Sequence, residues 1–324
     1  MLLAAAAILF GFIALIWSAD LLVAGAASIA RNFGISPIII GLTIVSLGTS
    51  APEILVSLTA SLSDAGPLAI GNAIGSNIAN IALVLGLTAL VAPLIVDQRC
   101  MRREIPILLL ATVSVGVLII DGVLSMRDGY LMLIFMAIII VLLVFNQLGA
   151  AKQAAKPDDE KMPELQPTRA WVTFIFGLVV LILSSKLLVW GAVLVAEELG
   201  ISELVIGLTI VAVGTSLPEL AATIASALRG HTEIAMGNII GSNLFNLLAV
   251  MAIPGIVGGQ VLDPDAISRD YASMAALTFF LAVAIFVSSK RSKSVPKEAY
   301  IGRVLGAVLV SSYALYYYFL LSTS

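Results

Sequence analysis

Charged residues are scarce in this chain of 324 residues. Asp, Glu, Lys and Arg make up 11% of it, 60% of it is hydrophobic, and the mean hydropathy is +1.10. A single water-soluble globule could not bury so much apolar side chain. The apolar stretches reach about 20 residues, the length of a membrane-crossing helix, and they lack the alternating pattern of a membrane barrel. The sequence therefore predicts an all-helical, polytopic membrane protein.

Cysteine and histidine each occur once, as Cys100 and His231. A lone cysteine excludes an intramolecular disulfide and a multi-cysteine metal site, and a lone histidine excludes a metal site built from several imidazoles. The first apolar run has no Lys or Arg before it and contains Asp20. We therefore expect that run to be a retained span and not a cleaved signal peptide.

The apolar stretches predict ten transmembrane helices. A polar linker, residues 149–169, is predicted to join two five-helix domains, residues 1–148 and 170–324, because it is the only polar stretch of any length and contains Pro157 and Pro163. The expected spans are 2–30, 37–62, 67–92, 105–121, 128–148, 170–196, 203–228, 232–257, 271–289 and 299–320.

The basic residues predict the orientation, since Lys and Arg are retained on the cytoplasmic side. Sorted onto alternate faces, 14 of the 17 fall on the face that carries the linker, Arg127 and Arg269 fall on the other, and Lys186 lies within a span. We therefore expect a cytoplasmic linker and outward termini. The 14 are Arg31, Arg99, Arg102, Arg103, Lys152, Lys156, Lys161, Arg169, Arg229, Lys290, Arg291, Lys293, Lys297 and Arg303.

One polar element occurs twice, at residues 41–87 and 207–253. At a constant offset of 166, 20 of the 47 positions are identical without a gap, and they include most of the Gly, Thr, Ser, Pro, Glu and Asn residues. Because each half holds an odd number of predicted spans, the second copy enters the membrane from the opposite side. Such inverted repeats are typical of secondary transporters, which bind their substrates near the midplane, between the halves.

Each copy carries a glutamate inside an apolar span, Glu53 and Glu219, after the motif Gly-Thr-Ser-x-Pro. An unpaired carboxylate there costs at least about 2.5 kcal/mol, so a compensating partner is expected. Proline frees the carbonyl four residues earlier, which belongs to Gly48 or Gly214, and unwound backbone at this depth is tolerated where it lines a cavity. The motif therefore gathers carboxylate, hydroxyl and carbonyl oxygens.

The following span of each copy adds further oxygens. The segment Gly-Asn-x-x-Gly-Ser-Asn-x-x-Asn places its serine and its last asparagine four residues apart on one helical face. Helix packing explains the glycines, Asn72 and Asn238 equally well. We expect the other four to be ligands: Ser76, Asn80, Ser242 and Asn246. A site made only of oxygens selects hard cations, and calcium accepts six to eight of them in a flexible geometry.

These two motifs, each present twice in ten predicted spans, resemble the alpha repeats of the cation/calcium exchanger superfamily, in particular the prokaryotic sodium/calcium exchangers. The resemblance covers essentially the whole chain. It implies an antiporter of the prokaryotic plasma membrane, with calcium and sodium as transported ions and no enzymatic activity. No cofactor, nucleic acid or obligatory protein partner is expected. It also implies that the first and sixth spans slide across the other helices.

The resemblance implies a set of ligands. Calcium would lie between both glutamates and the oxygens of two threonines, and sodium would occupy neighbouring positions. The calcium set is Glu53, Glu219, Thr49 and Thr215. The sodium set is the carbonyls of Ser46 and Ala212 with Ser50, Ser216, Ser76 and Ser242.

Some relatives carry an aspartate at one of the positions that Asn80 and Asn246 occupy here. With two neutral amides the site has a formal charge of about -2, so exchange of more than two sodium ions for one calcium ion is expected to be electrogenic. Proton/calcium exchange and potassium-dependent exchange remain alternatives on the same scaffold.

Other classes of function are weighed against these. A passive calcium channel could use paired carboxylates, but nothing resembles a repeated filter loop. An intramembrane hydrolase could use paired acids, but neither glutamate has a second acid near it in the sequence. Asp20 and Lys186 occupy equivalent places in the two halves, and they either contact each other or are solvated separately.

Overall fold

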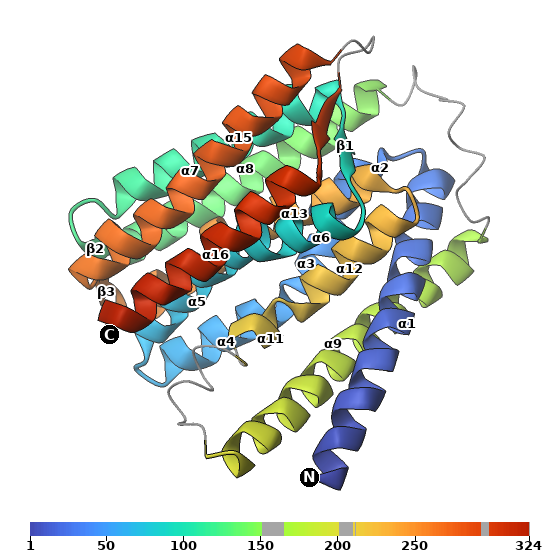
Figure 1. Ribbon diagram of the computed structural model, residues 1–324. Coiled ribbons are helices and arrows are strands. Elements are labelled where there is room, and N and C mark those ends of the chain that lie inside the picture. The colour runs from blue at the N-terminus through green and yellow to red at the C-terminus, as the bar shows by residue number, and fades with distance from the viewer. Residues whose placement is uncertain (151–164, 201–209, 211, 293–297, 324) are drawn as a thin grey trace.

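The structure is a computed structural model that describes residues 1–150, 165–200, 210, 212–292 and 298–323, and most of them are helical (Figure 1). The N-terminal half contains α1 (Leu2–Phe33), α2 (Pro37–Ile40), η1 (Gly41–Val45), α3 (Ser46–Thr49), α4 (Ala51–Leu62), α5 (Gly66–Ile78), η2 (Ala79–Val84), α6 (Leu85–Val91), β1 (Leu94–Val96), η3 (Cys100–Glu104), α7 (Ile105–Leu118), β2 (Val123–Leu124) and α8 (Met126–Ala150), where η denotes a π-helical turn.

The C-terminal half follows a similar order. It contains α9 (Pro167–Glu198), α11 (Ala212–Thr215), α12 (Leu217–Leu228), α13 (Thr232–Phe245), η6 (Asn246–Val250), α14 (Ala252–Gly258), β3 (Gln260–Val261), η7 (Ala266–Tyr271), α15 (Ala272–Arg291), β4 (Ala299–Ile301) and α16 (Arg303–Thr323).

Among the described residues, seven helices are long and apolar enough to cross a membrane, and one pair bent by 44°, Pro37–Thr49 with Ala51–Leu62, brings the number to eight. The other two predicted spans are not among these helices. One is α7, which ends at Leu118, and the other, 203–228, lies partly outside the described residues. The total of ten spans stays a prediction.

The predicted start of the last span is wrong. Residues 299–301 form strand β4, and the helix begins at Arg303. Hydropathy could not distinguish a strand from a helix here, because an apolar run such as Ala299, Tyr300 and Ile301 occurs in both. The strand exists because β1 offers it a partner: Leu94 pairs with Ile301 and Val96 with Ala299.

The connecting strands pair reciprocally between the halves. Strand β1 pairs with β4, and β2 pairs with β3, both antiparallel. Strands β1 and β2 flank α7, and β3 and β4 flank α15, the equivalent helix of the second half. The strand before each of these two helices therefore pairs with the strand after the other. This exchange ties together loops that are far apart in sequence.

Helices α1 and α9 run side by side along one flank of the bundle, where they also contact α2 and α12 (Figure 1). Glycines allow their close approach: a Cβ added at Gly25 or Gly177 would lie 2.6 Å from the backbone of the facing helix. Both helices end at a left-handed glycine, Gly34 (φ 62°) and Gly200 (φ 76°), a conformation that other residues adopt at a cost. The glycine contacts form two pairs related by the offset of 166: Gly11 with Leu188 and Gly177 with Leu22, then Gly25 with Phe174 and Gly191 with Ile8.

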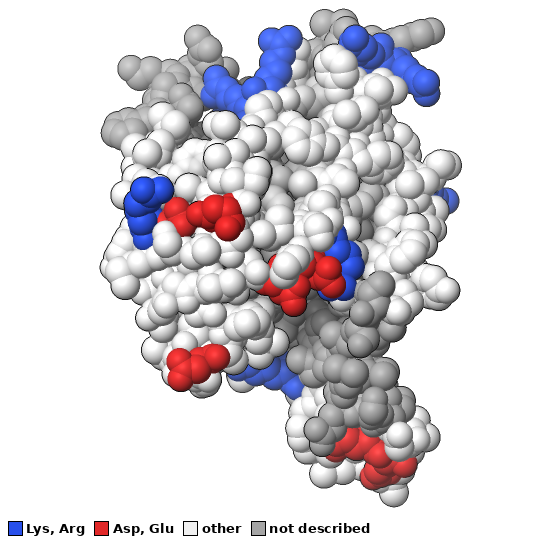
Figure 2. Space-filling model, turned by 90° about the vertical axis from the view of Figure 1, so that its left-hand side faces the viewer, with Lys and Arg blue, Asp and Glu red and all other residues white. Residues whose placement is uncertain are grey.

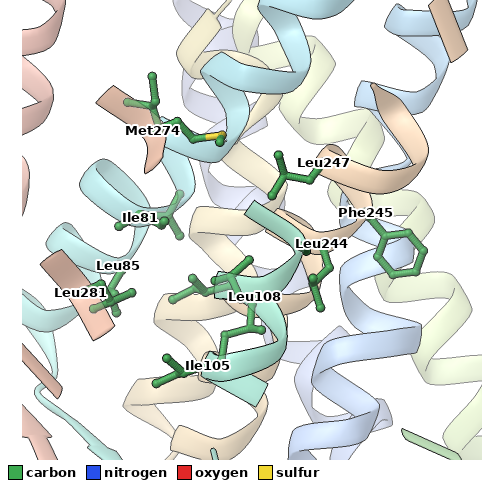
Figure 3. Close-up of a cluster of buried hydrophobic side chains, with 14 of the residues drawn as sticks. Ile81, Leu85, Ile105, Leu108, Leu244, Phe245, Leu247, Met274 and Leu281 are labelled. Carbon is green, nitrogen blue, oxygen red and sulfur yellow. The ribbon is translucent and has the colours of Figure 1, made fainter. Parts of the chain in front are cut away.

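The other helices enclose the main apolar core. Its side chains come from both halves, and equivalent positions such as Ile81 and Leu247, or Leu108 and Met274, both contribute to it (Figure 3). A second cluster joins α1 and α9 to the faces of α2 and α12. The bundle is thus one core shared by two similar halves, with the α1 and α9 pair packed on its side.

Candidate ion-binding site

Two breaks in the helices position the predicted glutamates. Helix α3 ends at Thr49 and α4 begins at Ala51; likewise α11 ends at Thr215 and α12 begins at Leu217. Ser50 and Ser216 occupy the junctions, and a proline lies in the first turn that follows each of them. Since Glu53 and Glu219 lie in those first turns, the positive end of a helix dipole faces each carboxylate.

The structure brings both carboxylates into one buried region. Each glutamate is 1% exposed. Hydrogen bonds cross between the halves here: the Ser50 hydroxyl donates to Glu219 Oε1 (3.1 Å), and the Thr49 hydroxyl lies 3.2 Å from Asn238 Oδ1. The two motifs therefore interlock and do not form separate sites.

Several buried oxygen and nitrogen atoms in this region have no hydrogen-bond partner in the described structure. Unpaired buried polar atoms are rare because each costs about 1 to 3 kcal/mol, so a cluster of them indicates a missing ligand. The sequence-predicted members of the cluster are Glu53 Oε2, Glu219 Oε2, Ser216 Oγ, Ser242 Oγ and both amide atoms of Asn80 and of Asn246.

The remaining predicted residues lie on the same elements. Ser46 is buried, and its carbonyl accepts hydrogen bonds from the Ser50 backbone N–H (2.9 Å) and from the Thr49 hydroxyl (3.3 Å). Ser76 is buried on α5, and Thr215 is half-buried at the end of α11. Ala212 begins α11, but its side chain lies outside the described part of the structure.

Asn72 and Asn238 support the site in a way that the sequence did not resolve. The Asn72 side chain donates to the Glu53 carbonyl (3.3 Å), and the Asn238 side chain lies 3.5 Å from the Glu219 carbonyl and donates to the Thr223 hydroxyl (3.0 Å). The equivalence of the two contacts shows a common role in holding the turn that carries the glutamate. The recurrence of Gly-Asn in both copies was the available signal.

The positions of Asn80 and Asn246 depend on π-helical turns. Asn80 lies in η2 and Asn246 begins η6, at equivalent points of the two halves. A π-helical turn inserts an extra residue and rotates the side chains that follow, and such turns occur frequently at functional sites. Periodicity at 3.6 residues could not have revealed them.

Ser185 is a further residue that sequence analysis missed. Its hydroxyl donates to the Gly214 carbonyl (3.0 Å), the carbonyl that Pro218 frees from the helix ladder. It lies on α9, outside the duplicated core, and its equivalent in the first half is Ala19. The second break is therefore tied to α9 by a bond that the first break cannot make to α1.

The contact between Asp20 and Lys186, one of the two interpretations of those residues, does not form. Asp20 pairs instead with Arg229, which follows α12, through two contacts of 2.5 Å. Lys186 forms no ion pair with any residue that the structure describes, and it lines a cavity of about 350 Å³ beside the second break, together with Pro52, Ser185 and Thr215.

The arrangement suits a hard cation. Its buried carboxylate, hydroxyl and amide groups come from both halves, and among the described residues no group of three or more His, Cys, Asp or Glu side chains could hold a metal ion. A cation here would therefore depend on hydroxyl, amide and carbonyl oxygens together with the two carboxylates. The sodium/calcium exchanger family model matches residues 3–145 and 169–322, both halves of the chain. The chain belongs to the sodium/calcium exchanger family. Its activity is the exchange of sodium for calcium across a membrane.

Relatives support this assignment along the whole chain. The exchanger is 44% identical to a putative antiporter, CaxA, of Alkalimonas amylolytica over all of both chains, and 41% identical to the inner membrane protein YrbG of Escherichia coli over 87% of this chain and 89% of that protein. Its fold is similar to the sodium-calcium exchanger NCX_Mj soaked with zero Na⁺ and Ca²⁺, with a TM-score of 0.83 and 34% identity over 97% of this chain and 98% of the other.

Proposed function

We propose that the exchanger binds one calcium ion between Glu53 and Glu219, with oxygens of Thr49 and Thr215 completing the set. Sodium ions compete by occupying the adjoining positions formed by the Ser46 and Ala212 carbonyls and by Ser50, Ser216, Ser76 and Ser242, with Asn80 and Asn246 at the edge of the site. The observation that carries this proposal is the cluster of buried oxygens without partners, which comes from both halves.

Charge counting gives the consequence for transport. The two carboxylates supply a formal charge of -2, which one calcium ion neutralises, since the neighbouring Asn80 and Asn246 are neutral amides. Exchange of three or more sodium ions for one calcium ion therefore moves net charge across the membrane.

The ten spans form two inverted repeats, and transport proceeds by alternating access. The reciprocal pairing of β1 with β4 and β2 with β3 supports this, as do the symmetric glycine contacts between α1 and α9. A close, smooth contact of small residues suits two helices that slide together past the bundle. The basic residues orient the chain with its linker in the cytoplasm and both termini outside, in the prokaryotic plasma membrane.

The test is calcium uptake into vesicles that contain the purified protein, with sodium, proton and potassium gradients imposed one at a time. We expect an outward sodium gradient alone to drive uptake, and an imposed membrane potential to change its rate. Uptake driven by a proton gradient, or a requirement for potassium, would reassign the coupling ion. Uptake that ignores all three gradients would indicate a channel.

A further inference from the structure

A cavity of about 400 Å³ lies between the start of α7 and α8, away from the ion site. One end of it is basic and the rest is apolar. It is lined by Arg99, Arg102, Arg103 and Glu104, then by Pro106, Ile107, Leu110, Leu142 and Leu143. Leu110 and Leu142 are 56% and 52% exposed, so the apolar walls open sideways from the bundle, where the bilayer surrounds the protein.

The basic end of the cavity carries excess positive charge. Arg99 contacts Glu104 at 3.8 Å, and the Glu104 side chain is fully buried. Arg102 and Arg103 are exposed, and neither pairs with a carboxylate in the described part of the chain. The lining residues, three arginines and one glutamate, carry a formal charge of +2 at the mouth of an apolar groove, and the nearby Asp97 reduces the local charge to +1.

The equivalent position in the second half shows that the fold does not require this charge. There, Arg269 donates to Asp270 (2.8 and 3.1 Å) and lies 3.4 Å from Asp265, and Tyr316 also donates to Asp270 (3.0 Å). Arg269, Asp270 and Asp265 stand at the offset of 166 from Arg103, Glu104 and Arg99 respectively. The equivalent segment before α15 therefore has one arginine, which is fully paired, and its arginine and two aspartates carry a net charge of -1.

The two clusters lie at different ends of the molecule. Figure 2 shows Lys and Arg side chains without acidic neighbours along the upper edge, where β1 and β4 lie in Figure 1, whereas lower on the same face Asp and Glu side chains lie beside further Lys and Arg side chains. The cavity with three arginines lies just after β1, at the end that the basic residues assign to the cytoplasm. Anionic lipids attract basic residues at that surface.

We infer that this cavity binds an anionic phospholipid of the cytoplasmic leaflet. The phosphate lies against Arg102 and Arg103, whose planar guanidinium groups match phosphate oxygens, and an acyl chain lies along Ile107, Leu110 and Leu142. A soluble phosphate would use the arginines alone and would leave the apolar walls without a role. The inference rests on the proposed orientation of the chain and is independent of the proposed ligands for calcium and sodium.

The test compares lipid retention by the purified full-length protein, measured by native mass spectrometry in mixtures of phosphatidylglycerol and phosphatidylcholine. We expect selective retention of phosphatidylglycerol, and a fall of about fivefold in its association constant for each arginine removed in Arg102→Gln and Arg103→Gln. The matched control is Lys290→Gln with Arg303→Gln, which removes the same charge from the same end outside the cavity.

A second variant tests the apolar half of the cavity. Leu110→Trp fills the groove without changing the charge, so it should also reduce retention of phosphatidylglycerol. Equal retention of phosphatidylglycerol by the arginine variants and the wild type would overturn the inference, because the arginines would then not attract the lipid. An equal loss in the control with Lys290→Gln and Arg303→Gln would also overturn it, because the attraction would then be general to the basic surface. If millimolar inorganic phosphate displaced phosphatidylglycerol completely, and Leu110→Trp retained phosphatidylglycerol as the wild type does, the arginines would be assigned to a soluble anion and not to a lipid.

Discussion

The two halves of this exchanger are alike at the ion site and unlike where that site meets α1 and α9. Both halves supply a broken helix, a buried glutamate and an asparagine that holds the glutamate turn. On the flanking helices the symmetry fails. Asp20 of α1 forms an ion pair with Arg229, whereas Lys186, its equivalent on α9, lines a cavity, and Ser185 binds the second break where the first half has Ala19.

This contrast separates two requirements. Binding one ion between the halves demands equivalent ligands from each, so the site retains its symmetry. Under the alternating access proposed above, the balance between the two orientations of the carrier would depend on how α1 and α9 are held against the bundle, and identical contacts on both would favour neither orientation. We infer that the unequal contacts on α1 and α9 set that balance.

The largest effect should come from the site itself. Glu53→Gln and Glu219→Gln each remove one of the two carboxylates proposed to bind calcium, and we expect each to lower calcium exchange by about 100-fold or more, since breaking a buried charged contact costs about 3 kcal/mol. The measurement is radioactive calcium exchange in vesicles. Glu197→Gln, at the exposed end of α9, is the control. Near-normal exchange by either site variant would remove the proposed calcium position, provided the variant elutes as a monodisperse protein.

A smaller and more selective change is expected from Asn80→Asp and Asn246→Asp. Both amides are buried without partners among the described residues, so an added carboxylate at the proposed site would introduce a titratable charge and alter the competition between sodium and calcium. We expect a change of about tenfold in that competition and a new dependence on pH. Because the halves are equivalent here, the two variants should act similarly. A transport profile identical to the wild type would put the asparagine outside the ion shell.

The neighbouring serines of α9 test the asymmetry of the helix breaks. Ser185→Ala removes the donor to the Gly214 carbonyl, whereas Ser184→Ala removes a bond to Leu181 of the same helix (3.0 Å). Both side chains are 4% exposed. We expect Ser185→Ala to lower stability by about 1 to 2 kcal/mol and Ser184→Ala by less, since only the first leaves a freed carbonyl without its donor. Thermal unfolding in detergent measures this, and equal losses would contradict a special role for Ser185.

The smallest effect on stability should come from the ion pair on α1. Asp20→Asn breaks a pair whose side chains are 52% and 37% exposed, so we expect a loss of less than about 1 kcal/mol, and no loss for Lys186→Gln. The balance between the two proposed orientations should respond to Asp20→Asn more strongly than stability does.

This balance can be measured by the accessibility of a cysteine introduced beside the proposed ion site and labelled from each face of the membrane. An unchanged balance in Asp20→Asn would mean that the pair does not hold α1.

Sequence alone identified the parts of this protein that stand out against an apolar background. In a chain with 11% charged residues, a glutamate after Thr-Ser-x-Pro is conspicuous, and its recurrence 166 residues later marked the site, the helix breaks and the two halves. The ranges 37–62 and 232–257 were predicted to within one residue of the helical segments because Gly, Pro and polar residues delimit them.

Only the tertiary structure decided how those parts meet. The pairing of Asp20 with Arg229, the bond from Ser50 to Glu219 and the exchange of strands between the halves each join residues more than 100 positions apart. Their partners depend on how helices cross, and hydropathy carries no information about crossing angles. The sequence therefore determined which oxygens are placed in the membrane, and the packing of the two halves determined that they face one another.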